Sequence, residues 1–417
     1  MLQQGAEQTV PPDESFGESL VRNDSSREDA ETDFPEVRRT KGMIDLDHNA
    51  TTRPSPGVLE TYCRVSREAW ANPGSRHALG RRARVVLEDS REQMAAILGA
   101  HADELVFTSG GTESNNLALR GLVRGSSGSI GLTAGEHPCV RETCQELAAS
   151  GYDLVWLPVD FMGRLDRCAA EELLDRTPRL MTCVLAHNET GVIQDVGPLA
   201  ATAAERGIPF HTDGVQAVGK IPVDFHALGV TSLAFAAHKF HGPRGVGGLL
   251  VRRGARLNPL LAGGHQESEK RPGTEPVPLI AAMAQALVEW KRDDEERTRK
   301  VAGLRDRLEA GLVARSAPAF VNAGETARLP NTTNIAFPGC DGEALLVALD
   351  LAGIACSLGS TCASGSTEPA PVLVAMGLPR NRLESSVRFS VGIDNTAEEI
   401  DVAIERIAAV VTRLRGR

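Results

Sequence analysis

Residues 232–245 read SLAFAAHKFHGPRG: an apolar run, then a histidine and a lysine, then a turn rich in Gly and Pro. This pattern predicts a buried strand that ends in a tight loop and holds Lys239 at its edge. A lysine in apolar surroundings is desolvated, so its pKa falls and its amine can form a Schiff base. Most loop lysines are ordinary solvated side chains, so the interpretation of Lys239 depends on the rest of the chain.

Around that strand, short apolar runs alternate with helical segments. We expect strands at residues 105–108, 129–133, 153–158, 180–186, 209–212, 232–236 and 247–251. Helices fit between them at residues 140–150, 169–175 and 198–206. Such alternation is typical of an α/β domain with a largely parallel sheet, in which ligands bind beyond the carboxyl ends of the strands.

Reactive polar residues follow four of these strands in succession. They are Glu136 with His137, His187 to Glu189, Asp213 with Gln216, and His238 with Lys239. One such placement carries little weight. Four at the same expected edge of a sheet predict a functional site there.

The segment SGGTESNN, residues 109–116, links the first strand to a helix. Strand, glycine loop and helix in this order direct backbone N–H groups and the positive helix end at an anion. The loop lacks the ending of a Walker P-loop and the spacing of a dinucleotide fingerprint, so a single phosphate is the favoured ligand. Taken alone, the segment fits equally well a plain glycine turn with Ser109 or Thr112 as the helix cap.

Composition divides the chain into three parts. Residues 1–42 are charged and poor in large apolar residues, so we expect a disordered acidic extension. Residues 55–296 carry the alternating pattern and form the predicted large α/β domain. Residues 43–54 and 297–417 are assigned to a smaller α+β domain, and a charged helical stretch at residues 289–313 is predicted to connect the two.

Charge and composition exclude several classes of protein. The formal net charge is −10, from 45 basic and 55 acidic side chains, which argues against a nucleic-acid binder. No apolar run is as long as a membrane span and the N-terminus has no signal-peptide pattern, so we expect no membrane association and a cytoplasmic location. The eight cysteines form no C-x-x-C pair. We therefore predict no metal site, and favour a reactive thiol over disulfides.

Together the motifs resemble those of the cysteine desulfurases, a class-V branch of the fold-type I enzymes that use pyridoxal 5′-phosphate (PLP). The resemblance spans residues 43–415 and rests on LDHNATT (46–52), NPGSRH (72–77), TSGGTES (108–114), EH (136–137), NETG (188–191), HTDGVQ (211–216), AHK (237–239), RPGT (271–274), STCAS (360–364) and RFS (388–390). It implies a mostly parallel seven-stranded sheet flanked by helices, a smaller α+β domain, and a homodimer. The implied reaction converts L-cysteine to L-alanine and passes the sulfur, as a persulfide on an enzyme cysteine, to an acceptor protein.

The resemblance also implies a role for each residue of the cofactor site. Lys239 would bind PLP covalently and move protons at the substrate Cα, and Asp213 would keep the pyridinium nitrogen protonated. His137 would stack on the ring and take part in acid–base steps. The other implied cofactor contacts are Gly111, Thr112 and His238 at the phosphate, Thr274 at the phosphate in the partner subunit, and Gln216 and Asn188 near the phenolic oxygen of the ring.

Substrate binding and sulfur transfer are implied for four further positions. Arg388 would clamp the carboxylate of L-cysteine, assisted by Asn72 and Asn188. Cys362 is the implied nucleophile, in a loop rich in Gly and Ser that can carry its thiolate into the pocket. Taken alone, Cys362 is more simply explained as a buried structural cysteine. Cys356 follows an apolar run and is predicted to pack in the core, with acceptance of sulfur from Cys362 as the alternative.

One position departs from the family pattern, since Ala236 stands where a serine usually contacts the phosphate. One phosphate hydrogen bond is then missing, or it comes from Ser109 or water. Three other functions remain open: a class-V aminotransferase, which needs no thiol; a selenocysteine lyase; and an inactive partner protein that kept the fold. The sequence leaves the sulfur acceptor open, since iron–sulfur cluster assembly and thiolation pathways both draw on such enzymes.

Overall fold

The computed structural model of the chain describes residues 42–123, 125–358 and 369–416. Residues 43–417 form one compact unit. Residues 1–41, nearly all of the predicted acidic extension, lie outside the described ranges, and so does the implied nucleophile Cys362. Within those ranges, no helix is long and apolar enough to cross a membrane.

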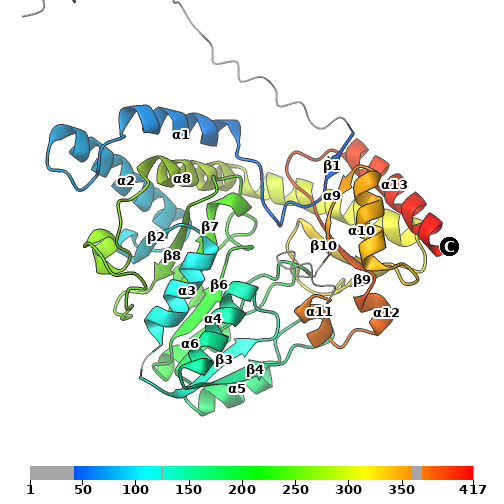
Figure 1. The fold of residues 1–417 in the computed structure, drawn as a ribbon, viewed down its shortest axis with the longest axis horizontal. Coiled ribbons are helices and arrows are strands. Elements are labelled where there is room, and N and C mark those ends of the chain that lie inside the picture. The colour runs from blue at the N-terminus through cyan, green and yellow to red at the C-terminus, as the bar shows by residue number, and fades with distance from the viewer. Residues whose placement is uncertain (1–41, 124, 359–368, 417) are drawn as a thin grey trace, which may run out of the picture. The chain divides into compact units, whose positions relative to one another are not determined.

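A seven-stranded sheet organises the larger part of this unit (Figure 1). In spatial order its strands are β2 (Leu105–Thr108), β8 (Gly247–Val251), β7 (Ser232–Ala236), β6 (Phe210–Asp213), β5 (Leu180–Thr182), β3 (Gly128–Thr133) and β4 (Tyr152–Leu157). Only β8 runs against its neighbours among these seven. The predicted α/β fold with a mostly parallel seven-stranded sheet is confirmed.

Both faces of this sheet are buried, because successive side chains of a strand enter opposite layers. In β7, Leu233 and Phe235 join one apolar core and Ala234 joins another. The first core is completed by α1 (Pro56–Glu68), α2 (Ala78–Ile97), α5 (Arg167–Asp175), α6 (Gly197–Glu205), α7 (Phe225–Leu228) and α8 (Val277–Arg292). The second is completed by α3 (Gly111–Leu122) and α4 (Pro138–Ala149). Figure 1 shows α1 and α8 side by side above the first face.

One strand is shorter than predicted, since β5 ends at Thr182 rather than at residue 186. The chain beyond it stays bonded to β6: Cys183 N donates to His211 O at 3.2 Å and Leu185 N donates to Asp213 O at 2.9 Å. Ala186 then forms an isolated bridge with Ile193, which turns the chain back. Residues 183–186 therefore continue beyond the end of β5 along β6, and residues 187–189 lie beyond the carboxyl edge of the sheet.

A separate apolar core surrounds a four-stranded antiparallel sheet. Its order is β12 (Ser357–Leu358), β13 (Ser386–Ser390), β10 (Thr332–Ala336) and β9 (Phe320–Asn322). β1 (Ile44–Asp45) pairs with β11 (Ile354–Ala355), which ties the first described residues to this part of the molecule. The helices of this part are α9 (Asp294–Arg315), α10 (Gly342–Leu351), α11 (Pro371–Ala375), α12 (Arg380–Leu383) and α13 (Ala397–Arg415).

The charged stretch predicted as one connecting helix is two helices, broken at Asp293 (φ −122°, ψ 22°). Before the break, α8 places Met283 and Leu287 in the core of the large sheet. After it, α9 places Leu304 and Leu308 in the core of the small sheet. The chain therefore passes from one core to the other at Asp293.

Candidate active site

A cavity of about 720 Å³ opens at the carboxyl edge of the large sheet. Segments that follow β2, β3, β5, β6 and β7 line it, together with residues after β1 and one residue of β13. The predicted site residues found in its wall are Gly111, Thr112, His137, Asn188, Asp213, Gln216, His238, Lys239 and Arg388. The four strand ends singled out in the sequence therefore meet at one place.

Two predicted site residues that the structure describes are not in this wall. Asn72 is exposed, and its Oδ1 accepts a hydrogen bond from Gly74 N at 2.8 Å. Thr274 is also exposed, and its implied role is toward a partner subunit. Cys362 lies outside the described residues, but Leu358 and Ala370, on either side of the segment that carries it, both line the cavity.

Lys239 lies in the short helix Ala237–Lys239 that follows β7. Its Nζ donates to the carbonyl oxygens of Asn49 (2.7 Å) and Ala50 (2.8 Å). Burial, and next the positive charge of Arg388, lowers the pKa of Lys239 from 10.5 to about 8. A substantial fraction of this amine is therefore neutral, and so nucleophilic, near neutral pH.

Asp213, the last residue of β6, is 5% exposed and is held by two donors. Val215 N donates to its Oδ1 at 2.9 Å, and Asn115 Nδ2 donates to its Oδ2 at 2.8 Å. Asn115 belongs to α3, which packs on the same strands. These two hydrogen bonds fix the position and orientation of the Asp213 carboxyl group in the cavity wall.

Behind Asp213, three fully buried polar side chains form a chain of hydrogen bonds. Asn115 Oδ1 lies 2.9 Å from His211 Nε2, and His211 Nδ1 lies 2.8 Å from Ser232 Oγ. An ionised Asp213 only accepts hydrogen bonds, so the amide nitrogen of Asn115 faces it and the amide oxygen faces His211. His211 then carries its proton on Nε2 and accepts at Nδ1 from Ser232. Burial lowers the pKa of His211 to about 3, so the ring is neutral.

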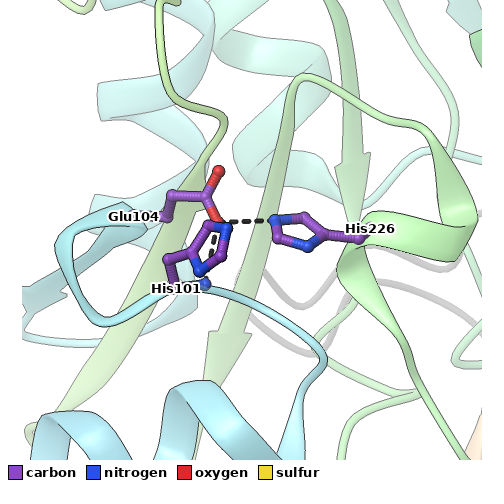
Figure 2. Close-up of side chains that lie close together, drawn as sticks. All are labelled: His101, Glu104 and His226. Atoms are coloured by element: carbon purple, nitrogen blue, oxygen red, sulfur yellow. Dashed lines mark hydrogen bonds and ion pairs between the residues drawn. The ribbon is translucent and has the colours of Figure 1, made fainter.

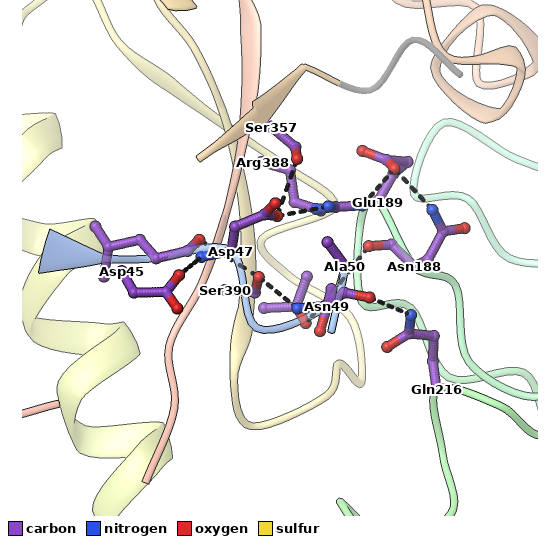
Figure 3. Close-up of polar contacts among 12 residues, drawn as sticks. Asp45, Asp47, Asn49, Ala50, Asn188, Glu189, Gln216, Ser357, Arg388 and Ser390 are labelled. Carbon is purple, nitrogen blue, oxygen red and sulfur yellow. Dashed lines mark hydrogen bonds and ion pairs between the residues drawn. The ribbon is translucent and has the colours of Figure 1, made fainter. Parts of the chain in front are cut away.

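Arg388 of β13 lies between two carboxylates, as Figure 3 shows. Its Nη1 is 2.7 Å from Glu189 Oε1 and its Nη2 is 2.7 Å from Asp47 Oδ1. Ser357 Oγ donates to the same Asp47 oxygen at 2.9 Å, and Asn188 Nδ2 donates to the same Glu189 oxygen at 2.7 Å. The guanidinium implied to clamp a substrate carboxylate is thus held in place by carboxylates of the chain.

Asn49, 1% exposed, joins the two parts of the molecule at the cavity. Its carbonyl accepts from Lys239 and from Gln216 Nε2 (3.0 Å), and its backbone N donates to Ser390 Oγ at 2.9 Å. Its Oδ1 accepts from the half-buried Lys220 Nζ at 2.7 Å. Because Lys220 also contacts Gln216, the segment after β1, the loop after β6 and the lysine after β7 form one hydrogen-bonded unit.

Glu136 is buried in the cavity wall beside Asp213. Burial, and next the charge of Asp213, raises the pKa of Glu136 to about 8. Its Oε1 accepts from Thr133 Oγ1 at 3.2 Å, while Oε2 has no hydrogen-bond partner among the residues that the structure describes. At neutral pH Glu136 is therefore mostly protonated and uncharged.

The phosphate end of the predicted site is formed by the N-terminus of α3, with Gly110 at φ 154° as its cap. Thr112 and His238 line the cavity there, and His238 Nδ1 lies 3.1 Å from Thr51 Oγ1. Burial lowers the pKa of His238 to about 4, so the ring is neutral and serves as a hydrogen-bond donor rather than as a charge. Ala236 is in the wall, whereas Ser109 is not among the lining residues.

Cys356 lies between β11 and β12 and packs against the core of the small sheet. Burial, and next the charge of Asp47, raises the pKa of Cys356 to about 12. Its thiolate is strongly disfavoured, which agrees with a packing role and not with a nucleophile.

Sequence reasoning missed Asn115, His211 and Ser232, and gave no role to Asn49, Asp47 or Glu189. The sequence held a signal for the first three. Asn115 lies in a helix, and His211 and Ser232 lie in strands that were predicted to be buried. A buried polar side chain needs a hydrogen-bond partner, so each of them indicated a contact. No signal named the partners, since Asn115 and Asp213 are 98 residues apart.

Comparisons with known proteins agree with this geometry. The aminotransferase class-V family model matches residues 44–402. The cysteine desulfurase of Nostoc sp. is 43% identical over 376 residues, which cover 90% of this chain and 94% of that protein. The solved structure of a NifS-like protein is 34% identical with a TM-score of 0.83, and the match covers 89% of this chain and all of that one. The structure of SspA in complex with cysteine is 30% identical with a TM-score of 0.73, and the match covers 84% of this chain and 99% of that one.

Proposed function

This chain belongs to the cysteine desulfurases of the aminotransferase class-V family, and from that premise we propose how its cavity binds PLP and takes sulfur from L-cysteine. The observation that carries the proposal is the meeting of Lys239, Asp213 and Arg388 in one cavity. They supply an amine of lowered pKa, a fixed carboxylate and a buried guanidinium. The amine would bind PLP covalently, the carboxylate would face the ring nitrogen of PLP, and the guanidinium would bind the carboxylate of the amino acid.

The residues present fit the cofactor. Lys239 would hold PLP covalently, Asp213 would face its ring nitrogen, and the α3 N-terminus with Thr112 and His238 would hold its phosphate. When bound, PLP would supply an electron sink for bonds at the substrate α-carbon. Ala236 brings a methyl group to the phosphate end where a hydroxyl would add a donor, so the phosphate relies on α3 and His238.

The substrate would enter the half of the cavity next to Arg388. Its carboxylate would bind the guanidinium, in exchange for part of the pairing with Asp47 and Glu189. Lys239 Nζ, free to lose a proton near neutral pH, would remove the proton from Cα and return it to the product. The SspA structure contains cysteine, which supports L-cysteine as the substrate here.

Sulfur transfer is assigned to Cys362, which lies outside the described residues. Its thiolate would attack the substrate sulfur, the substrate C–S bond would break, and the sulfur would remain on Cys362 as a persulfide. The carbon that loses sulfur would take up a proton, which completes L-alanine. An acceptor protein would then remove the sulfur, and iron–sulfur cluster assembly and thiolation pathways are both candidates for it.

The test is to add L-cysteine to the PLP-loaded protein and measure alanine and protein-bound persulfide. Wild type and Cys356→Ser should form both products. Cys362→Ser should keep the visible absorbance of PLP and form neither. Full alanine formation from L-cysteine by Cys362→Ser would contradict the proposal, and activity of that variant on selenocysteine alone would favour a selenocysteine lyase.

A homodimer and a cytoplasmic location complete the proposal. Thr274 lies exposed and outside the cavity of its own chain, as a contact to a partner subunit requires. The seven cysteines of the described ranges are free, which suits a reducing compartment. Sedimentation equilibrium should give twice the mass of the chain, and a monomer that is fully active would contradict the shared site.

A further inference from the structure

A second cluster of ionisable side chains lies on the large part of the molecule, away from the cavity: His101, Glu104 and His226 (Figure 2). His101 and Glu104 belong to the turn between α2 and β2, and His226 belongs to α7. None of the three is in the cavity wall. Each residue offers one ligand atom, and these three atoms all lie within 4.8 Å of one another.

Backbone hydrogen bonds bring these two segments together. Phe225 N donates to Leu98 O at 2.7 Å, and His226 N donates to Gly99 O at 3.1 Å. The two imidazole rings lie 4.8 Å apart between centroids, with 61° between their planes. The main chain thus holds the two segments that carry the cluster next to each other.

Glu104 is the fixed member of the cluster, at 2% exposed. Arg253 N donates to its Oε1 at 3.0 Å, His101 N donates to its Oε2 at 2.9 Å, and His226 Nε2 lies 2.7 Å from Oε2. A buried carboxylate beside two exposed imidazoles is a typical donor set for a metal ion.

We propose that His101, Glu104 and His226 bind a divalent transition-metal cation of the Zn²⁺ type. Two imidazole nitrogens and one carboxylate oxygen suit Zn²⁺, Co²⁺ or Ni²⁺, whereas Mg²⁺ and Ca²⁺ require oxygen ligands. Zinc bonds of about 2.0–2.2 Å place tetrahedral ligands roughly 3.3 Å apart, so the cation replaces the proton between His226 and Glu104 and widens that pair by about half an ångström. Water takes the fourth position, since both histidines are exposed.

Bound metal would join the turn before β2 to α7. Because the ligands come from positions 122 residues apart, the ion would close a long loop at the outer rim of the large sheet. The site is independent of sulfur transfer, so alanine formation should not require it. The prediction of no metal site rested on cysteine spacing, and this donor set contains no cysteine.

The test is equilibrium dialysis of the PLP-loaded, untagged protein against Zn²⁺. Wild type should bind one more zinc ion per chain than the double variant His101→Ala/His226→Ala. Thiolates also bind zinc, and the difference between the two proteins removes their contribution. His265→Ala is the matched control, because His265 also faces a carboxylate, Glu269, at 3.0 Å on the surface. It should bind as wild type does.

The single variant His101→Ala separates metal binding from the hydrogen bond between His226 and Glu104, which it leaves intact. We expect zinc affinity at this site to fall at least about tenfold. Zn²⁺ should also raise the Tm of wild type and His265→Ala more than that of His101→Ala. Equal zinc stoichiometry and equal affinity in wild type, His101→Ala and the double variant would overturn the proposal.

Discussion

The two halves of the active-site cavity are built in opposite ways. On the side proposed to bind the cofactor, Asp213 is held by neutral hydrogen-bonding groups, and the residues behind it belong to α3 (Asn115), β6 (His211) and β7 (Ser232). On the substrate side, Arg388 is held by the charged groups of Asp47 and Glu189, which come from different elements. Asp213 is thus held by hydrogen bonds within the large sheet and the helix packed on it, whereas Arg388 is held by ion pairs to segments far apart in the sequence.

The difference matches what each half must do. A cofactor stays bound through many turnovers, so its partners gain from being rigid and already in place. A substrate carboxylate arrives and leaves, and an arginine that already has anionic partners can exchange one for another without being left unpaired. The following predictions test this contrast.

Arg388→Gln should have the largest effect. Loss of the charged donor removes the clamp and leaves Asp47 and Glu189 without their cation, so kcat/KM for L-cysteine should fall about a hundredfold or more. The variant should still bind PLP and show its visible absorbance, because Lys239, Asp213 and the N-terminus of α3 are all retained. Steady-state kinetics and an absorbance spectrum provide the check, with Glu189→Gln expected to lower KM because one competing carboxylate is removed. An unchanged KM in Arg388→Gln would disprove the assignment.

Lys239 should make cofactor attachment strongly dependent on pH. Its lowered pKa of about 8 means that the reactive neutral amine is the minor form below that pH and the major form above it. The rate at which PLP joins the PLP-free protein should rise about tenfold per pH unit up to about pH 8 and then level off. Stopped-flow absorbance between pH 6 and pH 10 measures this. A rate that keeps rising to pH 10 would mean that the amine has its ordinary pKa.

Asn115→Ala should weaken the cofactor half with little effect on the substrate half. Asp213 loses one of two donors and His211 loses its acceptor, which costs about 1–3 kcal/mol. We expect PLP to dissociate about tenfold faster and KM for L-cysteine to change less than twofold. Asn116→Ala is the control on the same helix, since the amide of Asn116 bonds to Thr112 O and to Thr143 instead. Equal rates of PLP loss from both variants would contradict the role of Asn115 in holding Asp213.

Ala236→Ser should have the smallest effect. A hydroxyl at the phosphate end adds one hydrogen bond worth about 1 kcal/mol, so PLP should dissociate roughly fivefold more slowly. Ser109→Ala should leave the rate as it is, because Ser109 does not line the cavity. Fluorescence of released PLP follows both variants, and a faster release from Ser109→Ala would assign the missing phosphate contact to Ser109.

Much of the fold followed from local pattern. The strand at residues 232–236 was predicted to the residue, because the apolar run is too short for a helix and a turn rich in Gly and Pro follows it. The break at Asp293 was missed, because charged residues with high helix propensity continue on both sides of it and only packing on two different cores separates them. Nine of the residues proposed from the sequence as site residues line one cavity, but the residues that hydrogen-bond to them were not predicted.

By itself, the sequence determined the order of strands and helices, the placement of reactive side chains at strand ends and the membership of a PLP family. These depend on neighbours along the chain, where spacing and side-chain chemistry are visible. Only the tertiary structure decided that Arg388 lies between Asp47 and Glu189, that Asn115 bonds to Asp213, and that His101 and Glu104 meet His226. Each of these contacts joins residues about a hundred or more positions apart, and only the folded chain brings residues so far apart within hydrogen-bond distance.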